Sequence, residues 1–207
     1  MILAIDPGMQ GALCFHDPRS GEFVIEDMPI GYSTYRRIID QPGLLEMIRG
    51  FAARGATQMW LEKVGGRPGQ SGSAAFNFGA GYGCLSMAGL ACGMTIEAVP
   101  PATWKAAMAV TRNKAGCRER ASFLVPSHAH MFTRGKDDGR AEAALLAIYA
   151  ERQINGAPFD KAEAARIAVA RESREQSLAT RLARLAANRA RKSAAGAAVE
   201  VDPASLF

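Results

Sequence analysis

The fold is decided by the opening stretch Met1-Ile2-Leu3-Ala4-Ile5-Asp6-Pro7-Gly8, in which an apolar run stops at a strong turn signal. Residues 11–15 resume as an apolar run, and residues 22–28 alternate between apolar and polar side chains, which is typical of a strand. Three strands so close together in the sequence predict an antiparallel meander that opens a β-sheet.

Strands and helices alternate after this meander. Further strand-like segments are residues 57–64 and 94–99. Helical spacing of apolar residues marks the segments 44–51, 74–92, 103–108, 114–125 and 138–153. This order predicts an α/β protein with a mixed five-stranded sheet flanked by helices.

The composition changes after residue 156 towards alanine, arginine and glutamate. Between residues 161 and 192, lysine and arginine outnumber glutamate by nine to three, and large apolar residues are few. We therefore expect a core domain over residues 1–156 and a basic helical arm over 157–192. Residues 193–207, rich in small side chains, are expected to form a flexible tail.

Composition also excludes several classes of protein. The sequence contains no uncharged apolar run of eighteen residues, so a membrane-spanning helix is not expected. The first residues lack the basic flank of a signal peptide, which favours a cytoplasmic protein. The four cysteines form no CxxC pair and are interpreted as reduced structural thiols. A net charge of +5 gives modest support to a nucleic-acid partner.

Acidic side chains stand at the ends of separate elements. Asp6 ends the first strand, and Glu62 lies near the end of the 57–64 strand. Asp138 and Glu142, four residues apart, share one face at the start of the last core helix. Phosphodiester hydrolysis by two divalent ions needs three or four carboxylates that converge from different elements, and Mg²⁺ prefers such oxygen ligands. The pattern predicts a two-metal site of this kind.

Each of these acids also has an ordinary structural interpretation. Asp-Pro-Gly is a common turn, Glu62-Lys63 suits the edge of a strand, and acidic residues in a first helical turn stabilise the helix dipole. Their joint occurrence in this order favours the catalytic interpretation.

Four motifs carry a wider similarity. They are Ile5-Asp6-Pro7-Gly8-x-x-Gly11-Ala12, Leu61-Glu62-Lys63-Val64, Val99-Pro100-Pro101-Ala102-Thr103-Trp104-Lys105 and Lys136-Asp137-Asp138-Gly139-Arg140-Ala141-Glu142-Ala143. Over residues 1–152 the chain resembles the RuvC-type crossover junction endonucleases, in particular their divergent phage and prophage branch. The first and last motifs together are quite specific, whereas the Glu62 motif alone is weak.

The resemblance implies an RNase H-like nuclease domain over residues 1–156, in a bacterial or phage-infected cell. It implies a homodimer that nicks four-way junctions symmetrically with two Mg²⁺ or Mn²⁺ ions per site. The catalytic and metal-binding acids that it implies are Asp6, Glu62, Asp138 and Glu142. Members usually carry two aspartates three apart on the last helix, whereas Asp138 and Glu142 are four apart. That departure leaves Asp137 as an alternative metal ligand.

Basic and aromatic residues near the motifs are candidates for DNA contact. In the resemblance, the loop at residues 65–72 approaches the junction point, where Phe76 is the candidate to wedge against unstacked bases. Phe76 and Phe78 lie two apart on a helix, so at least one is expected to be exposed. The DNA-binding candidates are Arg67, Phe76, Lys105, Lys114, Arg118, Lys136 and Arg140. Core packing of the rings and solvated charges are the plain alternatives.

Two further partners are expected. Small residues at four-residue spacing on the 74–92 helix suit close helix packing, and the equivalent helix of the family forms the homodimer; packing on the chain's own sheet is the alternative. The terminal Leu206-Phe207 resembles motifs by which bacterial DNA-processing proteins dock on the sliding clamp. Asp202 stands where that motif usually has glutamine, and a frayed end is the alternative.

The leading functional hypothesis is an Mg²⁺-dependent endonuclease that nicks branched DNA such as Holliday junctions. A second hypothesis is an RNase H-like nuclease with another substrate, such as an RNA–DNA hybrid or flap or Y-shaped DNA. A third is a non-catalytic junction-binding protein. An actin-like kinase needs a longer, duplicated chain than these 207 residues.

Overall fold

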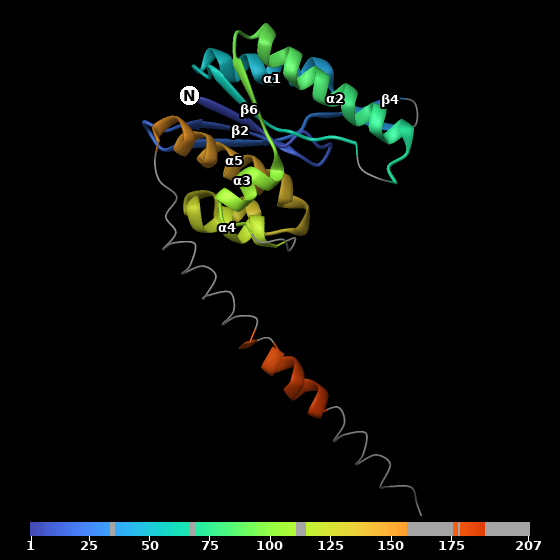
Figure 1. The fold of residues 1–207 in the computed structure, drawn as a ribbon, viewed down its shortest axis with the longest axis vertical. Helices are drawn as coiled ribbons and strands as arrows, with labels where there is room; N and C mark the ends of the chain where they lie inside the picture. Colours follow the sequence, from blue (N-terminus) through green and yellow to red (C-terminus); the bar gives the residue numbers. More distant parts are fainter. Residues whose placement is uncertain (34–35, 67–68, 111–114, 157–175, 178, 189–207) are drawn as a thin grey trace, which may run out of the picture. The chain divides into compact units, whose positions relative to one another are not determined.

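The computed structural model describes residues 1–33, 36–66, 69–110, 115–156, 176–177 and 179–188 (Figure 1). The chain forms two units, Met1–Phe159 and Asp160–Phe207. In the second unit, residues 176–177 and 179–188 are helical. Most of the expected arm at 157–192 and the whole tail at 193–207, with Leu206 and Phe207, lie outside the described residues.

A mixed five-stranded sheet is the centre of the first unit, which confirms the predicted α/β fold class. Its strands are β1 (Ile2–Ile5), β2 (Ala12–Asp17), β3 (Glu22–Asp27), β6 (Gln58–Glu62) and β7 (Thr95–Val99). Their order is β3-β2-β1-β6-β7, with β1 antiparallel to β2 and parallel to β6. An antiparallel meander is thus followed by two parallel strands, as the order of the predicted segments implied.

Helices cover both faces of the sheet (Figure 1). They are α1 (Gln41–Ala53), α2 (Gly72–Ala91), α3 (Pro101–Ala107), α4 (Gly116–Leu124) and α5 (Asp138–Asn155). Helices α1 and α2 lie on one face, and α3, α4 and α5 lie on the other. Two 3-10 segments, Pro126–Phe132 and Gly135–Asp137, lead into α5. No helix among the described residues is long and apolar enough to cross a membrane.

Alternation along β1 divides the core into two clusters. Leu3 and Ile5 point towards α1 and α2, while Ile2 and Ala4 point towards α5. Ten residues of α5 between Gly139 and Ala150 are buried, and five of them are alanines. Small side chains let this helix lie close against the sheet, so the end of α5 that carries the acidic residues is held near the ends of β1 and β6.

A second sheet of two strands, β4 (Ile30–Ser33) and β5 (Arg36–Ile39), was not predicted. Its strands have only four residues each, and Tyr32 and Ile38 are exposed, so no apolar alternation marks them. Helix α3 begins at Pro101, two residues before the predicted start, because proline suits the first turn of a helix.

Two glycines let α5 approach the turn between β1 and β2. A Cβ atom added at Gly139 would collide with the backbone oxygen of Gln10 and lie 2.7 Å from the Cα of Gly11. A Cβ atom at Gly11 would collide with the backbone oxygen of Asp6. The close approach fixes the first turn of α5 against the segment that carries Asp6.

We expect Gly139→Ala to destabilise the protein by about 1–3 kcal/mol, the usual cost of overpacking a tight contact. The matched control is Gly50→Ala in α1, where an added Cβ atom meets nothing within 4 Å. That change should stabilise the helix by about 0.5–1 kcal/mol. Urea unfolding of both variants measures the difference; equal midpoints would contradict the close packing of α5 on the turn.

Candidate functional site

Three of the predicted acids come together at one edge of the sheet. Asp6 follows β1, Glu62 ends β6, and Glu142 lies in the second turn of α5. Each offers a carboxylate oxygen, and these three oxygens lie within 4.8 Å of one another. The parallel register pairs Ile5 with Leu61, so the residues that follow them in each strand emerge side by side.

The environment of Asp6 favours its protonated form. Burial raises the pKa of Asp6 from 3.8 to about 7, and the nearby carboxylates of Glu142 and Glu62 add to the rise. The Gly8 backbone N–H, which donates to Asp6 Oδ1 at 3.3 Å, and the Lys105 ammonium act in the opposite direction. A negative charge on Asp6 is therefore unfavourable unless a cation binds beside it.

Helix α3 contributes two donors to the acidic cluster. Trp104 Nε1 donates a hydrogen bond of 3.1 Å to Glu62 Oε1. Lys105 Nζ donates to Glu142 Oε1 at 2.8 Å and lies 3.8 Å from Glu62 Oε1. Burial disfavours the charged ammonium, but its hydrogen bond to Glu142 and the charges of Glu142 and Glu62 outweigh this and raise the pKa of Lys105. Lys105, predicted as a DNA contact, thus binds the carboxylates.

Cys117 of α4 also contacts the cluster. Its Sγ atom donates to Glu142 Oε1 at 3.5 Å. Burial, with the nearby Glu142 carboxylate, raises the pKa of the Cys117 thiol to about 12, so it stays protonated and remains a donor. Neither Trp104 nor Cys117 was predicted to take part in the site. Trp104 stood inside a quoted motif, whereas nothing in the sequence marked Cys117.

The donor set fits a hard divalent cation. Asp6, Glu62 and Glu142 offer oxygen atoms only, which suits Mg²⁺ or Mn²⁺ better than a softer metal. A sparse set of three carboxylates is typical of Mg²⁺ sites, where the ion keeps several waters. Burial and the neighbouring carboxylates raise the pKa of Asp6, and a divalent cation at this position would stabilise the ionised carboxylate.

The other two predicted acids have different partners. Asp138 forms an ion pair with Arg118 Nη1, although it lies near enough to Cys117 to help raise the pKa of that thiol. Asp137 is buried and accepts hydrogen bonds from the backbone and side chain of Arg134, which lower its pKa. The structure therefore places Asp138 beside the cluster and Asp137 in a structural contact at the start of α5.

The predicted DNA contacts have varied surroundings. Phe76 is 75 % exposed on α2, and Lys136 is exposed before α5. Arg140 makes two hydrogen bonds to Asp27 of β3, at 2.6 and 2.5 Å, which join α5 to the sheet edge. The remaining candidates, Arg67 and Lys114, lie outside the described residues.

Comparison with known proteins gives structural similarity only. No family model and no curated protein matches the chain. It is similar to Thermus thermophilus RuvC in complex with a Holliday junction substrate, at 12% identity and a TM-score of 0.49, covering 73% of this chain and 94% of that one. It is similar to another Thermus thermophilus RuvC structure at 14% identity and a TM-score of 0.42, covering 73% and 95%. Identities this low do not transfer residue roles or activity.

The raised pKa of Asp6 has a testable effect on stability. Between pH 3.8 and about 7 the folded protein holds a proton that the unfolded chain releases, so metal-free stability should fall as the pH rises. The contribution of one such group is about 1.4 kcal/mol per pH unit. We expect urea unfolding in EDTA to show this fall for the wild type and a flatter profile for Asp6→Asn.

Adding Mg²⁺ should restore the stability that the wild type loses above pH 7, where the Asp6 carboxylate is ionised. Superimposable pH profiles for the wild type and Asp6→Asn would show that the titration of Asp6 does not cause the fall in stability.

Proposed function

We propose that this protein is a divalent-metal-dependent endonuclease that nicks branched DNA, with four-way junctions as the leading substrate. The observation that carries the proposal is the convergence of Asp6, Glu62 and Glu142, from three separate elements, to within 4.8 Å. The motif resemblance supplies the substrate class. Carboxylates gathered in this way serve phosphodiester hydrolysis better than they serve folding, because their mutual repulsion destabilises the fold.

Asp6, Glu62 and Glu142 would hold the cation, and Asp138, which lies beside them in an ion pair with Arg118, would be a further ligand. When bound, a pair of Mg²⁺ or Mn²⁺ ions supplies activation of water and stabilisation of the leaving oxygen. Trp104 orients Glu62 through its indole N–H, and Cys117 orients Glu142 through its thiol. These fixed donors reduce the motion that the carboxylates must lose on binding a metal.

Lys105 and the basic residues of α4 and α5 act on the DNA backbone. In the metal-free protein the Lys105 ammonium lies between Glu142 and Glu62. With a divalent cation held by these oxygens, the Lys105 ammonium would be available to a phosphate of the DNA. Arg118, which pairs with Asp138, and the exposed Lys136 would add further positive charge around the centre.

The exposed face of α2 supports the proposed homodimer. Gly79, Gly83, Met87 and Ala91 are all exposed, with Met87 at 63 %. The helix packs on its own sheet through the opposite face, where Leu85, Ala88 and Gly89 are buried. The small-residue stripe is therefore available to a second copy, and Phe76 begins the same face. The proposed clamp contact through Leu206 and Phe207 is a separate proposal from sequence alone.

The nuclease proposal is tested by nicking of a synthetic four-way junction with and without Mg²⁺. We expect nicking by the wild type and a loss of about 10³-fold or more in Asp6→Asn and Glu142→Gln, because several kcal/mol of transition-state stabilisation is removed. Junction binding should persist or tighten, because neutralising a carboxylate removes repulsion of the phosphates. Glu46→Gln, at an exposed position of α1, is the matched control with normal activity.

Linear duplex and RNA–DNA hybrid of the same length separate the alternatives. Preferential cutting of the hybrid would assign the protein to another substrate, and junction binding without cutting in any divalent metal would make it a binding protein. An Asp6→Asn variant that nicks at the wild-type rate would remove Asp6 from the centre.

The arm at residues 157–192 is proposed as a non-specific DNA contact. Each lysine or arginine that neutralises a phosphate adds about 0.9 to the slope of log affinity against log salt. Truncation after Pro158 should therefore weaken junction and duplex binding alike and make that slope shallower by up to a few units, while nicking at saturating protein persists. An unchanged slope would show that the arm does not contact DNA.

A further inference from the structure

The hairpin formed by β4 and β5 is basic, and its outer side chains are uncovered. Residues 28–39 contain two arginines, Arg36 and Arg37, and no acidic residue. Tyr32 is 82 % exposed, and Arg37 is exposed as well. Within the described part of the chain, neither Tyr32 nor Arg37 has a partner for its polar atoms. The outer half of the hairpin therefore lies outside the core, and its polar groups are available to another molecule.

Tyr32 and Arg37 form a pair on one face of the hairpin. They lie directly opposite each other on β4 and β5, and opposed residues of an antiparallel pair point to the same face, with Cβ atoms about 5 Å apart. The next pair on that face is Ile30 with Ile39, and both isoleucines pack against the core cluster under α1 and α2. The inner pair thus anchors the hairpin, while the outer pair presents a hydroxyl group and a guanidinium group side by side.

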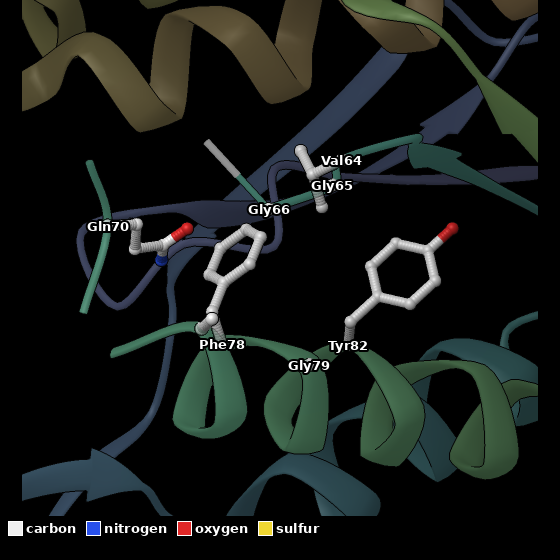
Figure 2. Close-up of a pocket in the computed structure, with 8 residues that line it drawn as sticks. Val64, Gly65, Gly66, Gln70, Phe78, Gly79 and Tyr82 are labelled. Carbon is white, nitrogen blue, oxygen red and sulfur yellow. The ribbon is translucent and has the colours of Figure 1, made fainter. Parts of the chain in front are cut away.

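Helix α2 supports the base of the hairpin. A Cβ atom added at Gly81 of α2 would lie 2.8 Å from Cδ1 of Ile39, so the two elements are in close contact. Figure 2 shows Phe78 and Tyr82 of the same helix pointing towards the loop that follows Glu62. An isolated two-stranded hairpin is marginally stable in water, so its packing on a helix that also contacts this loop holds the outer pair in place.

The hairpin leaves the main sheet at the edge where the acidic cluster lies. Asp27, the last residue of β3, pairs with Ala12, and the backbone oxygen of Ala12 accepts a hydrogen bond from the backbone N–H of Asp6. Asp27 is thus two strands, about 10 Å, from Asp6. Five residues of extended chain, from Asp27 to Tyr32, span at most about 18 Å. Tyr32 therefore lies within about 28 Å of Asp6, which is about eight base pairs of duplex DNA.

The hairpin and the basic residues of α4 belong to opposite faces of the sheet. Ile30 and Ile39 pack with the cluster under α1 and α2, whereas α4, which carries Arg118, packs with α5 on the other face. The arms of a four-way junction diverge from the branch point. A junction centred on the acidic cluster would therefore offer a different arm to each face.

We propose that the β4–β5 hairpin binds the phosphate backbone of one duplex arm beside the branch point, an inference that rests on the proposed function. The Arg37 guanidinium and the Tyr32 hydroxyl donate hydrogen bonds to phosphate oxygens, which are acceptors of opposite charge to the hairpin. Phosphate contacts of this kind fix the position of a duplex and carry no sequence information. The hairpin therefore orients an arm of the junction without reading its bases.

The test measures binding of a synthetic four-way junction in EDTA over a series of salt concentrations, so that the DNA stays uncut. Arg37→Gln removes the charge, and we expect it to bind roughly 3- to 10-fold more weakly at low salt. The slope of log affinity against log salt should become shallower by about 0.9, because one phosphate contact is lost. Arg37→Lys should keep the wild-type slope. Tyr32→Phe should bind about 2- to 5-fold more weakly with an unchanged slope, because it removes a neutral donor.

The matched control is Arg49→Gln, which removes the same charge from an exposed position of α1. Arg49 lies eight residues after the start of α1 at Gln41, about 12 Å along the helix from the end that follows the hairpin. This variant should keep the wild-type affinity and salt slope. Far-UV circular dichroism and urea midpoints verify that each variant is folded.

Neutral phosphates locate the contact on the DNA. Each phosphate within about eight nucleotides of the branch point is replaced in turn by an uncharged methylphosphonate. At one or two positions the wild type should lose the same factor that Arg37→Gln loses. Arg37→Gln should lose no more at those positions, because the two changes remove one interaction.

The wild-type protein separates failure of this inference from failure of the proposed function. If the wild type binds and nicks junctions but Arg37→Gln and Tyr32→Phe match Arg49→Gln in affinity and salt slope, the hairpin does not contact DNA. Strictly additive losses at every neutral phosphate would likewise show that Arg37 contacts none of them. If the wild type neither binds nor nicks branched DNA, the proposed function is wrong and the inference is wrong with it.

Discussion

The parallel pairing of β1 with β6 is the constraint on which the rest of the molecule depends. It aligns Ile5 with Leu61, so the two strands end together and present Asp6 and Glu62 at one edge of the sheet. The pairing is buried on both faces, because Leu3 and Ile5 pack under α1 and α2 while Ala4 packs under α5. A shift of one residue in this register would separate the two acids and exchange the two faces of the core.

Helices then complete the acidic cluster and supply hydrogen-bond donors to its carboxylates. The Gly139 contact and the small buried side chains of α5 bring Glu142 down to the strand ends. Three carboxylates this close repel one another. Hydrogen bonds from the Trp104 N–H, the Lys105 ammonium and the Cys117 thiol reduce this repulsion. Burial and the two neighbouring carboxylates still raise the pKa of Asp6 to about 7. A fold selected for stability alone would not retain this arrangement.

The sequence predicted those features that depend on local pattern. Apolar periodicity located the five central strands and five helices of the first unit. The motifs contained the three acids that converge, but they also pointed to Asp138, which pairs with Arg118 beside the cluster. The sequence did not reveal contacts between remote segments, such as Arg140 with Asp27 or Cys117 with Glu142, because no local pattern records them. Asp138 and Asp137 differ for the same reason: adjacent in sequence, they pair with Arg118 and Arg134 and point to different surroundings.

The placement of tryptophan gives the protein a built-in optical reporter. The chain has two tryptophans, and one of them, Trp104, contacts a carboxylate of the acidic cluster. Trp104 donates its indole N–H to Glu62, and Trp60 lies two residues before Glu62 on β6, edge-on to Tyr149. Indole emission depends on the polarity and hydrogen bonding of its surroundings. The emission of Trp104 should therefore change when the hydrogen bonding of Glu62 changes, without any attached dye.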